Sequence, residues 1–264
     1  MTGYLSNIWR LRHFWLALVR IDLGRRYRGS IIGIGWSLLQ PIAMTIVLCI
    51  VFSQIFGQPI RTFAPLLLSG LTFWNFLMAV VLQGCQCFFH NESYIRQHPA
   101  PLAIYPLRTT LGAGFHFLLG LAIAVVFVWC VNGFGNVPAL LSLVPTLLLL
   151  FIVGWSLAVC MGVANVMFQD SQHLIEVFMQ IMFYLTPTIY PASLLIEKLE
   201  KHHAAWLMNL NPFAVLLDMI RQPLLYGALP SPVTTAFGVL TGLVAVSAAS
   251  LALRCFEKRM IFYL

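Results

Sequence analysis

Charged residues are scarce in this chain. Of its 264 residues only 9% are Asp, Glu, Lys or Arg, whereas 60% are hydrophobic, and the mean hydropathy is +0.89. Soluble domains carry about 25% charged residues, so too few are present here to cover a surface exposed to water. Several apolar runs reach the roughly 20 residues that a helix needs to cross a bilayer. The composition therefore excludes a soluble fold and predicts an all-α integral membrane protein.

The sequence also lacks a nucleotide-binding motif. A P-loop needs the pattern G-x-x-x-x-G-K-[ST], whose backbone amides cradle phosphate groups. All the lysines of the chain, Lys198, Lys201 and Lys258, lie outside any glycine-rich loop. We therefore expect that this chain does not hydrolyse ATP by itself.

Residues that could form a metal site or an active site are equally sparse. Cys85, Cys87 and His90 are spaced too tightly for the usual zinc pattern, and no second ligand pair follows them, so we expect no metal. We count His116 and Glu176 as the intramembrane ionisable residues, which is fewer than a proton relay or a catalytic cluster needs. We expect no catalytic residue and no cofactor in this chain. An intramembrane transferase is kept as an alternative.

Six apolar segments are long enough to be transmembrane helices. We predict spans at about 31–56, 63–86, 107–131, 138–166, 174–190 and 233–253. In the fourth of these, Gly154, Ala158 and Gly162 recur at four-residue spacing, which predicts a face for close helix packing.

Two further segments complete the predicted topology. Residues 1–30 alternate aromatic residues with arginines, which predicts a cytoplasmic amphipathic helix lying in the headgroup plane. The apolar piece 204–225 lies before the last span and is interrupted by asparagine and proline. A re-entrant or interfacial helix pair fits this piece better than a crossing. Residues 31–264 would then form one transmembrane domain.

Positive charges are unevenly divided between the two sides of this topology. With the N-terminus inside, the outer segments hold four of the fifteen Lys and Arg residues, Arg61, Lys198, Lys201 and Arg221, and the inner segments hold the other eleven. Cytoplasmic segments carry such an excess. The net charge of +7 is thus explained by topology, and we expect no nucleic-acid binding. Both termini are predicted to be cytoplasmic.

Aromatic residues make up 13% of the chain, and many lie near the predicted outer ends of spans. They are Phe52, Phe56, Phe63, Phe73, Trp74, Tyr184 and Tyr190. Aromatic residues form an interfacial belt in membrane proteins generally. Aromatic planes also pack on the C–H faces of sugar rings, so the alternative is a channel lined by six of them, Phe52, Phe56, Phe73, Trp74, Tyr184 and Tyr190.

Four segments carry a family resemblance. They are LVRIDLGRRYRGSIIGIGWSLLQP (Leu18–Pro41), IVFSQIFG (Ile50–Gly57), FQDSQHLIEVFMQIMFYLTPTIYP (Phe168–Pro191) and NLNPFAVLLDMIRQPLLYG (Asn209–Gly227). In order and spacing they resemble the ABC-2-type permeases that export polysaccharides, over nearly the whole chain. The first segment is similar to exporters of O-antigen, teichoic acid and related glycans, and less like the drug exporters of the same superfamily.

The resemblance implies a mechanism and partners. Such permeases have an amphipathic interface helix, six spans and two short re-entrant helices, and they work as homodimers with two copies of a separate cytosolic ABC ATPase. ATP and Mg²⁺ would bind to that partner. The two permease copies would enclose a channel in the bacterial cytoplasmic membrane, through which a glycan linked to a polyprenyl diphosphate lipid is exported. A drug or small-lipid exporter and a purely structural scaffold are the alternatives.

The resemblance also implies roles for particular residues. Residues 91–97 would lie at the inner gate, and the N-terminal helix would contact the ATPase. The residues expected for gating or coupling are Asn91, Glu92, Tyr94, Arg96 and Asp170. Arg25, Arg26 and Arg28 would guide the diphosphate headgroup, because a planar guanidinium binds two phosphate oxygens at once. Setting the topology is the alternative role for these three arginines.

Overall fold

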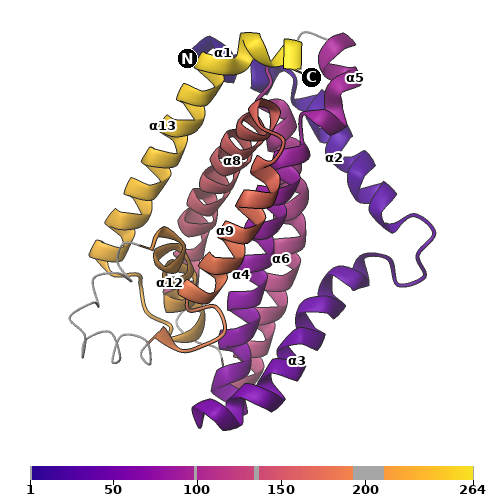
Figure 1. Ribbon diagram of the computed structural model, residues 1–264. Helices are drawn as coiled ribbons and strands as arrows, with labels where there is room; N and C mark the ends of the chain where they lie inside the picture. Colours follow the sequence, from indigo (N-terminus) through magenta and orange to yellow (C-terminus); the bar gives the residue numbers. More distant parts are fainter. Residues whose placement is uncertain (1, 98–99, 134–136, 193–210, 264) are drawn as a thin grey trace.

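The chain folds into a bundle of helices whose two termini lie at the same end (Figure 1). This computed structural model describes residues 2–97, 100–133, 137–192 and 211–263, and no strand occurs in those ranges. The longer helices are α2 (Arg12–Tyr27), α3 (Trp36–Phe56), α4 (Ile60–Gln86), α6 (Ile104–Asn132), α8 (Leu143–Met167), α9 (Ser171–Leu185), α12 (Pro212–Leu225) and α13 (Pro232–Tyr263). The shorter ones are α1 (Thr2–Arg10), η1 (Gly33–Gly35), η2 (Phe89–Asn91), α5 (Glu92–Gln97) and α7 (Val137–Leu141). We call the end that holds both termini the terminal end, and the opposite end, where α3 meets α4, the far end.

Five helical segments are long and apolar enough to cross a membrane. They are Gly33–Phe56, Ile60–Gln86, Ile104–Val131, Pro138–Met167 and Pro232–Glu257. They correspond to five of the six predicted spans, and they confirm an all-α, multi-pass membrane protein. The remaining predicted span, 174–190, is helical only in part. Helix α9 has 15 residues, about 22 Å at 1.5 Å per residue, which is less than the ~30 Å thickness of the hydrocarbon core.

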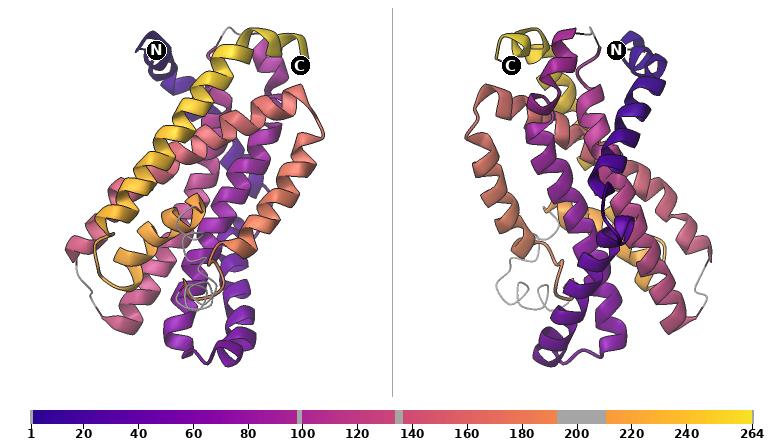
Figure 2. Two further views of the ribbon diagram at one scale, coloured as in Figure 1. Left: turned by 60° about the vertical axis from the view of Figure 1, so that its left-hand side comes forward. Right: turned by 90° about the vertical axis from the view of Figure 1, so that its right-hand side faces the viewer.

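The amphipathic segment predicted over residues 1–30 is divided into two helices, α1 and α2. Near the break between them, the ring N–H of Trp15 donates to the carbonyl of Ile8 at 3.1 Å. Phe14 and Trp15 pack against the start of α6. From there α2 runs beside α6 and ends at about half the height of the bundle (Figures 1 and 2). The second half of α2 therefore lies along a helix of membrane-spanning length.

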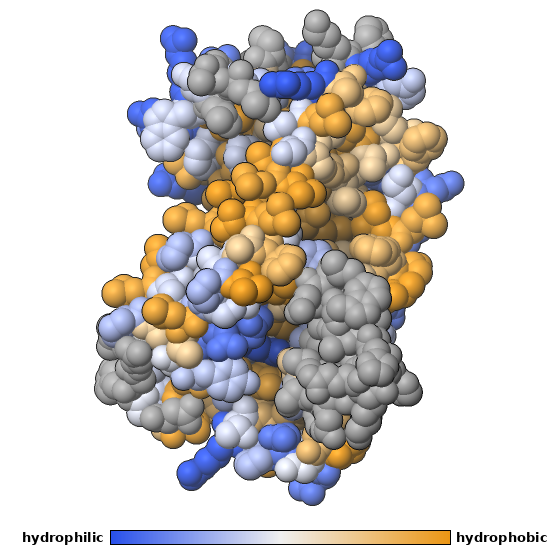
Figure 3. All heavy atoms as spheres, turned by 90° about the vertical axis from the view of Figure 1, so that its left-hand side faces the viewer, coloured by the Kyte–Doolittle hydropathy of each residue, from blue (hydrophilic) through white to orange (hydrophobic). Residues whose placement is uncertain are grey.

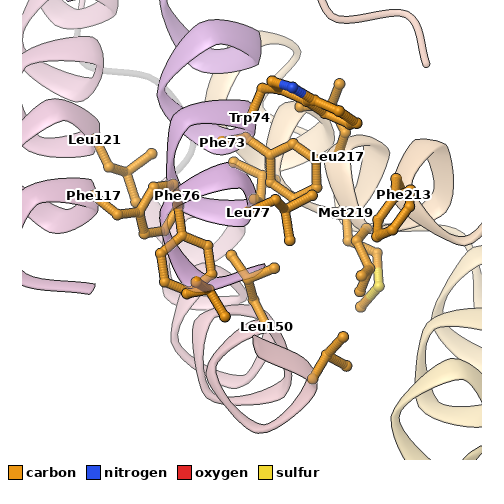
Figure 4. Close-up of a cluster of buried hydrophobic side chains, with 14 of the residues drawn as sticks. Phe73, Trp74, Phe76, Leu77, Phe117, Leu121, Leu150, Phe213, Leu217 and Met219 are labelled. Carbon is orange, nitrogen blue, oxygen red and sulfur yellow. The ribbon is translucent and has the colours of Figure 1, made fainter. Parts of the chain in front are cut away.

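Helix α4 forms the centre of the bundle. Of its most apolar 18-residue window 78% is buried, against 17–44% for the other four segments. Figure 4 shows the reason, because side chains of α6, α8 and α12 surround those of α4. Phe76 packs on Phe117 with ring centroids 5.0 Å apart, and Trp74 meets Phe213 edge-on at 5.9 Å. A helix that is enclosed in this way needs apolar residues all round and not on one face only.

Small residues let α8 approach α4 closely. A Cβ atom added at Gly84 would lie 2.8 Å from Cα of Ala158, and one added at Gly162 would lie 2.9 Å from the carbonyl oxygen of Gly84. A Cβ atom at Gly154 would lie 3.1 Å from the ring of Phe76. The packing face predicted from Gly154, Ala158 and Gly162 is therefore confirmed, and its partner is α4.

Large apolar side chains cover much of the outside. Figure 3 shows one face of the bundle, where hydrophilic residues gather toward the top and hydrophobic residues form a broad band below them. On α13 the exposed apolar residues include Phe237, Leu240, Leu243, Val244 and Leu251. Helices α3 and α9 expose similar rows, including Ile46, Ile50, Ile55, Val177, Phe178 and Ile181. Lipid or another protein chain must cover such surfaces.

The α4–α8 contact predicts different effects of alanine at two glycines. Gly84→Ala places a methyl group against the backbone of α8, so we expect the free energy of unfolding to fall by about 1–3 kcal/mol. Gly112→Ala is the matched control, because a Cβ atom there meets nothing within 4 Å and alanine favours a helix. Thermal unfolding of the purified chain measures both variants. Equal midpoints would contradict the close approach of the two helices.

Candidate functional site

Three polar side chains from three elements meet near the terminal end. Arg108 of α6 binds the carboxylate of Asp22 on α2 through two hydrogen bonds, in which Nε donates to Oδ2 and Nη2 donates to Oδ1. Its Nη1 donates to Oδ1 of Asn91 at the end of η2. The amide of Asn91 in turn donates to the carbonyl of Cys87 at 2.6 Å. We call Asp22, Arg108 and Asn91 the terminal-end triad.

The hydrogen bonds of this triad fix the orientation of the Arg108 and Asp22 side chains as well as the distance between them. A guanidinium bound to a carboxylate by two parallel hydrogen bonds tolerates little rotation. The Arg108 side chain is 13% exposed and that of Asp22 is 42% exposed, while Asn91 is buried, so water reaches these bonds mainly from the side of Asp22. The triad therefore ties α2 and the η2–α5 segment to the same point of α6.

The other residues predicted for the inner gate lie on α5 and in the α8–α9 connection. Glu92 and Arg96 form an exposed ion pair at 2.8 Å, one turn apart on α5. Tyr94 contacts Phe14 of α2 edge-on, with ring centroids 6.4 Å apart. Asp170 is exposed and precedes α9, at the same end of the bundle as α5 (Figure 1). The structure thus brings all five predicted residues to the terminal end.

A second polar junction lies halfway along the bundle. The hydroxyl groups of Tyr27, the last residue of α2, and Ser37, in the first turn of α3, each lie 3.0 Å from Nδ1 of His116 on α6. The two hydroxyl groups also contact each other. His116 is 12 residues after Ile104, the first residue of α6, which is about 18 Å along the helix. The connection between α2 and α3 therefore lies about halfway along α6 and not beyond either end of the bundle.

The three arginines predicted to guide a headgroup stand at this junction. Arg25 and Arg26 lie in the last turn of α2, and Arg28 follows it. All three are exposed, and none pairs with a carboxylate in the described part of the chain. Arg26 also lines a cavity of about 210 Å³ together with residues of α3, α4 and α6.

In the half of the bundle toward the far end, Asn211 joins the start of α12 to the end of α9. Its side-chain oxygen accepts hydrogen bonds from the backbone N–H groups of Phe213 and Ala214, which caps α12. Its amide nitrogen donates to the hydroxyl of Thr186 at 3.0 Å and to the carbonyl of Leu185 at 3.3 Å. One side chain thus satisfies polar groups on both helix ends.

Arg221 of α12 completes the polar contacts of the stretch that follows α9. It is buried, and it donates to the carbonyls of Pro187, Thr188 and Leu66 and to the hydroxyl of Ser69. Three segments, α12, α4 and residues 187–188, therefore share one guanidinium. Gly70 leaves the space for it, because a Cβ atom there would lie 2.6 Å from Nη2 of Arg221.

The six aromatic residues predicted to line a channel separate into two groups. Phe52 and Phe56 stack on each other on α3, and they pack against the same buried cluster as Ile189 toward the far end. Tyr190 donates its hydroxyl to the carbonyl of Tyr184 at 2.8 Å. These four residues are partly or largely exposed, and the chain brings them to the same region.

The prediction is wrong for the other two, Phe73 and Trp74. They are 0% and 5% exposed and lie near the middle of α4, within the core cluster of Figure 4. Neighbouring helices cover most of α4 and bury these two residues, which the predicted span places near its outer end. Neither ring presents a surface to a ligand.

The polar contacts of Arg108 and Arg221 are not predicted from the sequence, because a topology argument treats these arginines only as charges. Arg108 and Arg221 each lie among apolar residues of a helix. An arginine in such a position needs a partner inside the protein, and this is the signal that could have singled them out. The identity of the partners depends on which helices are neighbours.

Membrane-crossing helices, with polar contacts at the terminal end, at mid-height and at the far end, define an all-helical multi-pass membrane protein. The chain belongs to the ABC-2 type transporter family, whose family model matches residues 13–225.

The chain is similar to permeases of O-antigen export systems. It is 24% identical over 232 residues to the O-antigen export system permease protein RfbA of Klebsiella pneumoniae, which covers 86% of this chain and 83% of that protein. It is 25% identical over 225 residues to the O-antigen export system permease protein RfbA of Myxococcus xanthus, which covers 82% of each chain. The resemblance to polysaccharide-exporting ABC-2 permeases is thereby confirmed.

The terminal-end triad predicts a measurable coupling energy between two of its members. In a double-mutant cycle of Asp22→Ala and Arg108→Ala we expect a coupling of about 1.5–3 kcal/mol in the free energy of unfolding, since a charged group accepts both hydrogen bonds. The exposed pair Glu92 and Arg96 is the control and should give about 0.3–0.5 kcal/mol. Denaturant or thermal unfolding of the seven proteins in the two cycles, which share the wild type, provides the values. Equal couplings would show that the triad does not tie α2 to α6.

Proposed function

We propose that this chain is the transmembrane subunit of an ABC exporter that moves a lipid-linked polysaccharide across the bacterial cytoplasmic membrane. Its similarity to O-antigen export permeases over 82–86% of its length carries the proposal. The lack of a P-loop in the sequence suits a subunit whose ATPase is a separate chain. Two copies form the channel together with two copies of a cytosolic ABC ATPase, which binds ATP and Mg²⁺.

The proposed topology has six crossings with both termini in the cytoplasm. Two observations support it. Both termini lie at the terminal end, which requires an even number of passages, and α9 with residues 186–190 runs from that end toward the far end (Figure 1). Irregular backbone at membrane depth is tolerated where protein groups bind it, as Asn211 and Arg221 do here.

The re-entrant helix pair belongs to the same proposal. Helix α12 has 14 residues, about 21 Å, so it is too short to cross alone. The other member of the predicted pair falls within residues 193–210, outside the described residues.

In this proposal the terminal end faces the ATPase. Helix α5 carries the exposed residues Tyr94 and Arg96 and the partly exposed Glu92, which suit contact with a partner, and Asp170 lies at the same end. The terminal-end triad carries a displacement of the η2–α5 segment to α2 and α6, because Arg108 of α6 binds both Asp22 of α2 and Asn91, the residue before α5. Gating then follows from ATP-driven movement of the partner.

The proposed substrate contacts extend from mid-height of the bundle toward the far end. Arg25, Arg26 and Arg28 guide the diphosphate headgroup of the polyprenyl lipid from mid-height. The partly or largely exposed aromatic residues Phe52, Phe56, Tyr184 and Tyr190 stack on sugar rings nearer the far end.

Co-purification with the partner ATPase tests the proposed function. We expect a lipid-linked glycan to raise the ATP turnover of the complex several-fold, because substrate binding favours the state in which the partner closes on ATP. A small hydrophobic drug serves as the control substrate and should leave ATP turnover at its basal rate. Stimulation by the drug alone would identify a drug exporter instead.

The arginine cluster allows a separate prediction on whole cells. Replacing Arg25, Arg26 and Arg28 together by Gln should lower glycan export at least about tenfold, since each lost charged hydrogen bond costs on the order of 1.5–3 kcal/mol. Labelling of cysteines placed near each terminus reports the orientation in the same cells. Export at the normal rate with normal orientation would refute headgroup guidance, and inverted orientation would show that the cluster acts on topology.

A further inference from the structure

A polar cavity lies in the middle of the bundle, between α2, α3, α4 and α6. Its volume is about 210 Å³, several times the ~30 Å³ that one water occupies in the liquid. Its polar lining consists of Arg26, Ser37, Gln40, Thr72, Asn75 and His116. Asn75 is 15 residues from the start of α4 and 11 from its end, about 22 Å and 16 Å along the helix. The cavity is therefore far from either end of a membrane-spanning helix.

Three of the lining side chains have no hydrogen-bond partner in the described part of the chain. They are the guanidinium of Arg26 and the amides of Gln40 and Asn75, and all three are exposed in the single chain. An unpaired amide or charge at this depth is costly beside lipid, and such groups face a water-filled space or a ligand instead. Three of them around one cavity mark it as a place where something polar enters.

The composition of the lining identifies the chemistry of that ligand. The described lining contains no carboxylate, so a metal cation or an amine finds no counter-charge there. It contains instead the positive charge of Arg26 and the N–H groups of two amides. The nearest acidic residue along α2, Asp22, is already bound by Arg108. A site that offers positive charge and N–H donors suits an oxyanion.

His116 adds a further donor. Its Nδ1 lies against the hydroxyl groups of Tyr27 and Ser37. When a hydroxyl group donates to Nδ1, the proton of the neutral ring is on Nε2, which can then donate to a ligand. The junction of Tyr27, Ser37 and His116 also fixes the end of α2, so Arg26 is held beside the cavity.

We propose that this cavity binds the phosphate or diphosphate group of the substrate, with Arg26 as its charged ligand and Gln40, Asn75 and His116 as neutral donors. The inference rests on the proposed function in so far as the transported lipid carries a diphosphate. It adds three binding residues from three spanning helices to the arginine cluster. It also distinguishes Arg26, which lines the cavity, from Arg25 and Arg28, which do not.

Binding of a synthetic isoprenyl diphosphate tests the site directly. The full-length chain is placed in lipid nanodiscs, and the dissociation constant of farnesyl diphosphate is measured for the wild type and for Arg26→Gln, Gln40→Leu and Asn75→Leu. Each change should weaken binding about tenfold or more, as expected for the loss of a hydrogen bond to a charged group. Unchanged affinity in all three variants would overturn the site.

Matched controls separate loss of the site from loss of the fold. Gln54→Leu removes an exposed amide from the same helix as Gln40, and Arg20→Gln removes an exposed arginine from the same helix as Arg26, and neither residue lines the cavity. Both controls should bind as the wild type does. Leucine at Gln40 or Asn75 should leave the unfolding midpoint equal or higher, because an unpaired amide is replaced by an apolar group. A lower midpoint in both Leu variants would show that the amides are structural.

Competition identifies the source of the anion. Inorganic pyrophosphate that competes as well as the lipid indicates a site for free anions, whereas preference for farnesyl diphosphate indicates a lipid headgroup, and either result supports an oxyanion site. Equal competition by farnesol, which has no phosphate, would overturn it.

If the wild type binds farnesyl diphosphate but lipid-linked glycan never stimulates the partner ATPase, the site stands and the exporter assignment fails. If glycan is exported normally by all three variants, the site fails and the exporter assignment stands.

Discussion

Polar groups at membrane depth have no water to bind, and this constraint governs how the chain is arranged. Helix α9 can stop at Leu185 because the side chains of Asn211 and Arg221 bind the backbone that follows it. Those bonds also draw α12 against α4, where Phe213 and Leu217 join the central core. The side chains of Asn211 and Arg221 therefore supply hydrogen bonds that a longer α9 would make within its own backbone.

The same constraint links the terminal end to the middle of the bundle. Arg108 and His116 lie 8 residues apart on α6, about 12 Å along the helix, and each binds a residue of α2. Helix α2 is thus attached to α6 at two levels, and Arg108 adds the η2–α5 segment at one of them. A partner that moves α5 would act on the arginines at the end of α2 through contacts that are already formed. The side-chain amides of Gln40 and Asn75 stay unpaired, and in our proposal they bind a ligand.

Features that depend on composition and spacing could be predicted from the sequence. Five spans and the packing face of Gly154, Ala158 and Gly162 belong to this class. The early end of α9 also had a signal, since the residue before Pro187 is biased away from the helix. By contrast, the burial of Phe73, the path of α2 and the partners of Arg221 depend on contacts between distant segments. Tyr27 and His116 are 89 residues apart, and Arg221 and Leu66 are 155 residues apart, and no local pattern encodes such pairs.

Transport in a defined system tests the central claim most directly. The chain and its partner ATPase are reconstituted into vesicles with the ATPase facing outward, and the lipid-linked glycan that reaches the lumen is measured after ATP is added outside. The account predicts accumulation that requires ATP, both proteins and the intact diphosphate lipid. Accumulation without the ATPase, or none with the complete pair, would contradict it.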